Sequence, residues 1–94
     1  MSIHYGLEKF KSAILLLVEP GDIHSRVQAA MCQHIIHLSP SSDVSEVIKD
    51  ELQKLLDQYH DTCAQKISDL DEIDAEHLAK HIIEIHYKWL ESLH

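Results

Sequence analysis

Glycine and proline are scarce in this sequence, and each occurs only twice among 94 residues. β-Sandwiches and barrels need many tight turns, which depend heavily on these two residue types. The composition is instead dominated by residues that mostly favour helices, namely Leu, Ile, Glu, Lys, Gln and Ala. The composition therefore predicts an all-helical fold.

Long hydrophobic runs are absent as well. The longest uninterrupted apolar stretch covers the six residues 13–18, whereas a membrane-spanning helix needs about 20 and a signal peptide about 7–15 behind a basic start. We expect neither element, and we place the protein in the cytoplasm. With 45% apolar residues the chain can still bury one core, so we expect a single domain over residues 1–94.

Cysteine is limited to Cys32 and Cys63. Two cysteines are too few for a disulfide scaffold, and a cytoplasmic compartment keeps thiols reduced. We therefore expect two free thiols at core positions, where a thiol stays protonated and is a poor nucleophile.

Motifs for catalysis are also missing. With Gly6 and Gly21 as its only glycines, the chain cannot build a phosphate loop, a dinucleotide-binding turn or a nucleophile elbow. The sequence therefore predicts no enzyme, no catalytic residue and no cofactor.

Basic residues are outnumbered by acidic ones, 8 against 16, which gives a formal net charge of −8. Nucleic acids and anionic membranes are bound through basic surfaces. We therefore expect no direct nucleic-acid contact and no membrane contact. A basic protein would be attracted instead.

Four segments carry apolar residues at helical spacing. We expect them to form helices over about 5–18, 23–38, 44–67 and 75–93. Asp22 is a candidate N-cap for the second helix, and Asp43 with Glu46 resembles a capping box for the third. The third helix is the longest unless it breaks within 59–62. Short connections between such helices predict a small antiparallel four-helix bundle that runs up, down, up and down. Its core should include Ile14, Ile35, Leu55, Leu56, Ile82 and Trp89.

Histidine is abundant, with nine copies, and two pairs have same-face helical spacing: His34 with His37, and His77 with His81. Such pairs can chelate zinc or nickel, but no third ligand stands at a diagnostic distance. We therefore predict no metal site, and we expect His34 and His86 at the core margin with the other histidines solvated. A metal-binding bundle is the least favoured function.

Acidic residues form two candidate partner-binding clusters. The first, which we call the acidic stripe, lies opposite the apolar face of the third helix and comprises Glu46, Asp50, Asp57 and Asp61. The second, the acidic corner, precedes the last helix and comprises Asp69, Asp71, Glu72 and Asp74. An EF-hand is excluded because Asp74 stands where the loop needs glycine and Lys80 where it needs glutamate. The simpler interpretations are a solvated helix face and acids that stabilise a helix start.

Two functions follow from these features. The first is a small protein-binding inhibitor, such as a bacterial immunity protein or antitoxin, whose acidic surface covers the basic surface of a nuclease toxin. The second is a self-associating structural or regulatory subunit. It would be a homodimer that buries the broad apolar face of the last helix, with Tyr87, Trp89 and Leu93 between the chains.

Overall fold

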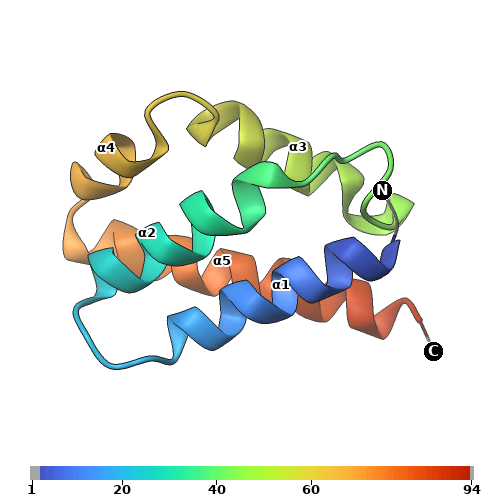
Figure 1. Ribbon diagram of the computed structural model, residues 1–94, viewed down its shortest axis with the longest axis horizontal. Coiled ribbons are helices and arrows are strands. Elements are labelled where there is room, and N and C mark those ends of the chain that lie inside the picture. Colours follow the sequence, from blue (N-terminus) through green and yellow to red (C-terminus); the bar gives the residue numbers. More distant parts are fainter. Residues whose placement is uncertain (1–2, 94) are drawn as a thin grey trace.

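The computed structural model describes residues 3–93, and helices account for 76% of them, with no strand in that range. The all-helical prediction is confirmed. Figure 1 shows the elements in chain order: α1 (Ile3–Leu17), α2 (Ile23–Gln33), a 3-10 turn η1 (Ile35–His37), α3 (Glu46–Tyr59), α4 (Cys63–Ser68) and α5 (Glu72–Glu91). No helix within 3–93 is both long and apolar enough to cross a bilayer.

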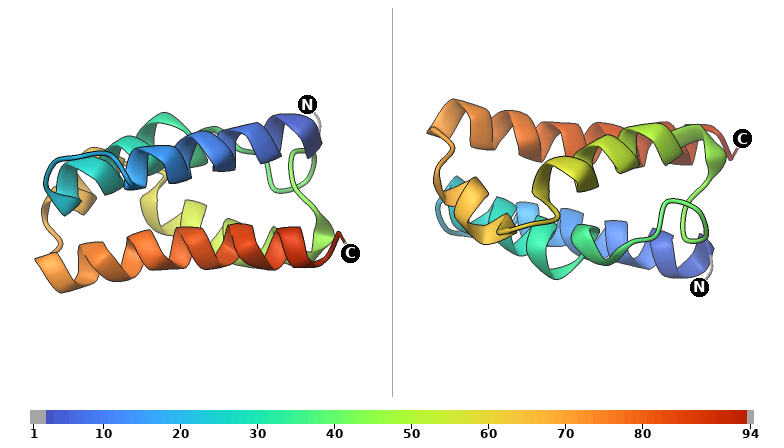
Figure 2. Two further views of the ribbon diagram at one scale, coloured as in Figure 1. Left: turned by 90° about the horizontal axis from the view of Figure 1, so that it is seen from below. Right: turned by 90° about the horizontal axis from the view of Figure 1, so that it is seen from above.

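The helices form two layers, which Figure 2 shows from opposite sides. One layer holds α1 and α2, with the short α4 beside α2, and the other holds α3 and α5. Contacts between the layers run mainly from α2 and α1 to α5. Because α4 is an additional short helix, a simple four-helix arrangement is not confirmed.

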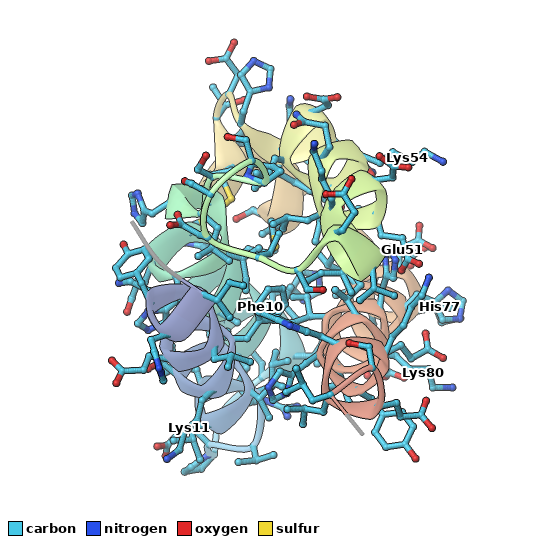
Figure 3. The ribbon with its side chains drawn as sticks, turned by 90° about the vertical axis from the view of Figure 1, so that its right-hand side faces the viewer. Phe10, Lys11, Glu51, Lys54, His77 and Lys80 are labelled. Atoms are coloured by element: carbon cyan, nitrogen blue, oxygen red, sulfur yellow. A yellow bond between two sulfur atoms is a disulfide. The ribbon has the colours of Figure 1, made fainter. Side chains whose placement is uncertain are left out.

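The core lies between the layers and is formed by buried side chains of α1, α2, α3 and α5. Trp89 is fully buried, and its ring meets Phe10 of α1 edge-on at 6.0 Å between centroids. Figure 3 shows Phe10 directed into the interior, while Lys11, Lys54 and Lys80 point outward. Five of the six predicted core residues are buried, namely Ile35, Leu55, Leu56, Ile82 and Trp89.

The buried face of α1 differs from the predicted one. Ile14 is only half-buried, so its assignment to the core is wrong, and Ala13 is buried in its place. The small residues Gly6 and Ala13 both lie on the buried face of α1. A Cβ atom on Gly6 would lie 1.8 Å from the carbonyl oxygen of Asp43 and 3.1 Å from the Trp89 ring, so α1 approaches its neighbours closely through Gly6.

The connection from α2 to α3 also departs from the prediction. The second helix ends at Gln33, and the start of α3 is capped by Ser45, whose hydroxyl accepts from the Val47 amide. The predicted capping box at Asp43 is wrong. Asp43 is only 1% exposed, and its carboxylate accepts a 2.9 Å hydrogen bond from the Ser39 amide. Its carboxylate therefore closes the loop after Pro40 rather than capping a helix.

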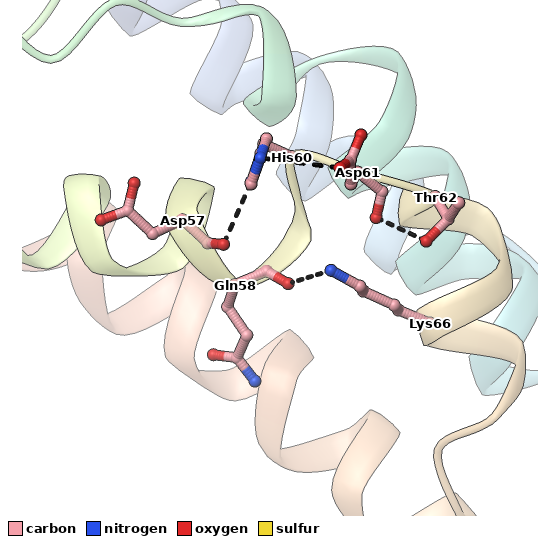
Figure 4. A network of polar contacts seen from close by, with 6 residues as sticks. All are labelled: Asp57, Gln58, His60, Asp61, Thr62 and Lys66. Carbon is pink, nitrogen blue, oxygen red and sulfur yellow. Dashed lines mark hydrogen bonds and ion pairs between the residues drawn. The ribbon is translucent and has the colours of Figure 1, made fainter.

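The predicted third helix is interrupted within 59–62, the range in which the sequence allowed a break. α3 ends at Tyr59, and Thr62 adopts a left-handed conformation with φ of 50° before α4 begins. Figure 4 shows how the break is tied together: the Lys66 ammonium donates to the Gln58 carbonyl at 3.0 Å, and His60 Nδ1 contacts the Asp57 carbonyl at 3.1 Å.

The break turns α4 back onto α2, where Cys63 and Cys32 form a disulfide with their Cα atoms 6.1 Å apart. The expectation of two free thiols is therefore wrong. The sequence could not show this pairing because the two residues are 31 positions apart and meet only through the turn at 60–62.

Candidate protein-binding surface

Three of the four residues of the acidic stripe lie on one helix. Glu46, Asp50 and Asp57 are exposed on α3, opposite the buried side chains of Ile48 and Leu52. Asp61 is exposed too, but it lies in the turn beyond the end of α3. The break at 60–62 therefore separates Asp61 from the regular helical array that the sequence predicted.

The carboxylates of the acidic stripe have few partners. Gln53 Nε2 donates to Asp57 Oδ1 at 2.9 Å, and Asp61 Oδ2 lies 3.9 Å from His60 Nε2. Within residues 3–93, no residue of the stripe forms an ion pair with lysine or arginine, although Lys54 is exposed at its edge. A nearby acid outside the stripe, Glu51, is the one that pairs with Lys88 of α5. Within the described range 3–93, the carboxylates of the stripe are therefore not held in ion pairs with lysine or arginine.

At least one residue of the acidic corner has a structural role. Asp71 is the N-cap of α5, and its side chain accepts a 2.7 Å hydrogen bond from the Asp74 amide. Glu72 and Asp74 lie in the first turn, where the helix dipole favours negative charge. Asp69 is the C-cap of α4, and its carboxylate accepts a hydrogen bond from Gln65 Nε2 at 3.0 Å. The interpretation as acids that stabilise a helix start therefore holds for Asp71.

A shallow groove of about 280 Å³ brings one corner residue next to α3. Asp74 lines it together with Gln58 and Tyr59 of α3 and the exposed His77 and His81 of α5. Burial raises the pKa of the Tyr59 phenol, and the negative charge of Asp74 raises it further. The remaining corner residues do not line this groove.

The histidines largely follow the predicted distribution. His34 and His86 are half-buried, and burial lowers the pKa of both. The ring of His86 stacks on Phe10 at 5.8 Å between centroids. Among residues 3–93 no group of three or more His, Cys, Asp or Glu side chains is arranged to hold a metal ion.

One histidine interaction was missed by the sequence analysis. His24 is half-buried, and its Nε2 lies 2.7 Å from the Leu70 carbonyl, which links α2 to the loop before α5. His24 also lines a second groove, together with the N-cap Asp22, Arg26 of α2, and Glu72 and Glu76 of α5. Asp22 caps α2 as predicted, and the hydrogen bond from the Ser25 amide lowers the pKa of its carboxyl. No spacing along the chain relates His24 to Leu70, so only the fold reveals this contact.

The outer edge of α5 carries exposed apolar side chains. Ile83, Tyr87 and Leu90 are 41%, 62% and 38% exposed, at positions that share one side of the helix. Trp89, by contrast, is fully buried within its own chain. The expectation that Trp89 lies between two chains is therefore wrong, because the side chain is already covered by the core.

Comparison of the chain with models of protein families, with curated proteins and with solved structures found no match.

Proposed function

We propose that this protein is a binding module that recognises a basic protein partner through the acidic stripe on α3. The observation that carries the proposal is the exposure of Glu46, Asp50 and Asp57 on one helix face, without a lysine or arginine partner among residues 3–93. A net charge of −8 adds a long-range field of the same sign. Such a surface accelerates association with a cationic partner more than it increases the final affinity.

A basic nuclease toxin is the partner class that fits this charge best. Nucleases need a cationic surface to hold the phosphate backbone, so an acidic module that covers this surface would exclude the substrate. The proposal is thus an inhibitor of immunity-protein or antitoxin type, of bacterial origin and acting in the cytoplasm, a compartment that would hold Cys32 and Cys63 in their reduced form. In this proposal, α1, α2, α3 and α5 form an antiparallel four-helix bundle, and α4 is an insertion before the last helix.

The first test is capture of a partner at low and high salt with matched charge variants. The variant Asp50→Lys with Asp57→Lys reverses two charges of the stripe. Its control, Glu8→Lys with Glu84→Lys, reverses two exposed charges on α1 and α5, so both proteins have the same net charge. We expect the control to retain a basic partner that the stripe variant loses. Retention by both variants, or capture of an acidic partner only, would refute the proposal.

A second candidate function is self-association through the outer edge of α5. It is favoured by the exposed side chains of Ile83, Tyr87 and Leu90, which an oligomer would cover. Sedimentation equilibrium at micromolar concentration separates the two functions. A monomer supports the inhibitor, whereas a dimer that dissociates on Ile83→Ser with Leu90→Ser supports self-association.

A further inference from the structure

The disulfide between Cys32 and Cys63 joins two helices that are distant in the sequence. Cys32 lies in the last turn of α2, and Cys63 is the first residue of α4. Both residues are half-buried rather than enclosed in the core. A groove of about 210 Å³ runs along α2 and is lined by Cys32 together with Ser25, Gln28, Ala29 and Gln33. A small thiol that enters this groove therefore comes next to Cys32.

The helix on the other side of this bond is short and packs mainly on α2, and the hydrogen bond between His24 and the Leu70 carbonyl holds the segment that follows it. α4 has only six residues, too few for an isolated helix to be stable in water. Its N-cap, Thr62, makes no side-chain capping bond and has a positive φ. The Ser68 hydroxyl reaches Gln28 at 3.4 Å in an exposed position, and Lys66 contacts Gln58 at the surface.

The core depends on α4 far less than on the other helices. Ile67 is the one residue of α4 that is buried. By contrast, α1, α2, α3 and α5 each supply several buried side chains to one continuous cluster. Loss of α4 from its place would therefore remove Ile67 from the core cluster, whereas Phe10 and Trp89 lie on α1 and α5.

We propose that the Cys32–Cys63 disulfide is a redox-operated clasp, and that reduction by a dithiol releases α4 and the turn at 60–62 from α2 while the remaining helices stay folded. This inference is independent of the proposed partner. It also makes the local structure of α4 responsive to the redox poise of the compartment.

Reduction proceeds by thiol–disulfide exchange in two steps. A thiolate of the dithiol attacks Cys32 Sγ, the bond between the two cysteine sulfurs breaks, and Cys63 leaves as a thiolate. The second thiolate of the reductant then attacks the other sulfur of the reductant, which is bonded to Cys32 in the mixed disulfide, and Cys32 leaves as a thiolate. Two electrons pass from the dithiol to the cystine, the dithiol becomes a cyclic disulfide, and its two protons end on Cys32 and Cys63.

Reduction kinetics under native conditions test the accessibility of the clasp. With dithiothreitol as the probe, we expect the rate to rise linearly with reductant concentration, because attack does not wait for unfolding. Two thiols should then be alkylated per chain, and none before reduction. A rate that levels off at the global unfolding rate would overturn the proposal, and so would two free thiols in air-oxidised protein.

Hydrogen exchange followed by mass spectrometry tests the release of α4. On reduction, amides within 62–70 should exchange at rates close to those of an unfolded chain, while those in the middle of α1 and α5 should remain protected and accelerate only by the loss of global stability. The Cys32→Ala, Cys63→Ala variant should reproduce this pattern without reductant. Unchanged exchange within 62–70, or loss of protection from all helices together, would contradict the proposal.

Discussion

The helices α3 and α5 pack against each other through their inner faces, yet their outer surfaces differ in chemical kind. α3 presents Glu46, Asp50 and Asp57 to solvent, whereas α5 presents Ile83, Tyr87 and Leu90 along one edge. The two helices are tied together by the core and by the Lys88–Glu51 ion pair. The comparison separates two requirements: the inner faces determine stability, and the outer faces are available for recognition.

The largest effect on stability should come from the inner face of α5. Trp89→Ala removes a fully buried ring that contacts Phe10, and we expect a loss of about 3–5 kcal/mol in the free energy of unfolding. Urea denaturation followed by circular dichroism measures it. A loss below about 1 kcal/mol would mean that Trp89 is not packed in the core.

The next effect should come from the disulfide beyond the end of α3. Its residues are 31 positions apart, so the chain-entropy model gives about 3–4 kcal/mol of stabilisation through restriction of the unfolded chain. The Cys32→Ala, Cys63→Ala variant should unfold at a correspondingly lower urea concentration. If oxidised wild type, reduced wild type and this variant unfold at the same midpoint, the cross-link does not form or does not constrain the chain.

A smaller loss in the free energy of unfolding is expected where α1 approaches Asp43 and Trp89 through Gly6. Gly6→Ala places a methyl group against the Asp43 backbone, which cannot move as a flexible side chain would. We expect a loss of about 1–3 kcal/mol, typical of overpacking. The control, Gly21→Ala, lies where a Cβ has open space, so any loss there reports its positive φ of 123° rather than packing. A neutral Gly6→Ala would show that α1 does not approach this closely.

Acid should weaken the fold through His34 and His86. Burial lowers the pKa of both below the ordinary value of 6.5, so the unfolded chain binds protons more readily than the folded one. The free energy of unfolding should therefore fall as the pH drops below about 6.5. The Asp22 carboxyl, whose pKa is lowered from 3.8, contributes only in a more acidic range. Denaturation at several pH values checks this, and the His34→Gln, His86→Gln variant should show a flatter profile.

Much of the fold could be predicted because it depends on local periodicity and capping. The inner face of α5, the buried Leu55 and Leu56 of α3 and the Asp22 cap all follow from residues near one another in sequence. The remaining features depend on contacts across the fold. The orientation of α1 depends on Gly6, which hydrophobic spacing ignores, and the burial of Asp43 depends on a loop that folds back on Ser39.

The candidate surface was predictable to a similar degree. All eight acidic residues of the stripe and the corner are exposed, as the helical pattern indicated. The sequence did not show that Asp61 falls outside α3, because Thr62 is a β-branched residue in a left-handed conformation, which has no sequence signal. It also could not show that Asp74 shares a groove with Tyr59, since that contact joins two helices.

The association rate with a captured basic partner tests the central claim most directly. Wild type, the Asp50→Lys, Asp57→Lys variant and the Glu8→Lys, Glu84→Lys control would be compared at about 0.02 M and 0.5 M salt, which brackets strong and weak electrostatic attraction. Urea midpoints should first show that both variants stay within about 1 kcal/mol of wild-type stability. We predict that reversal on α3 slows association about tenfold or more at low salt, that the control slows it much less, and that the difference shrinks at high salt. Equal rates for the two variants at low salt would contradict the assignment of α3 as the recognition surface.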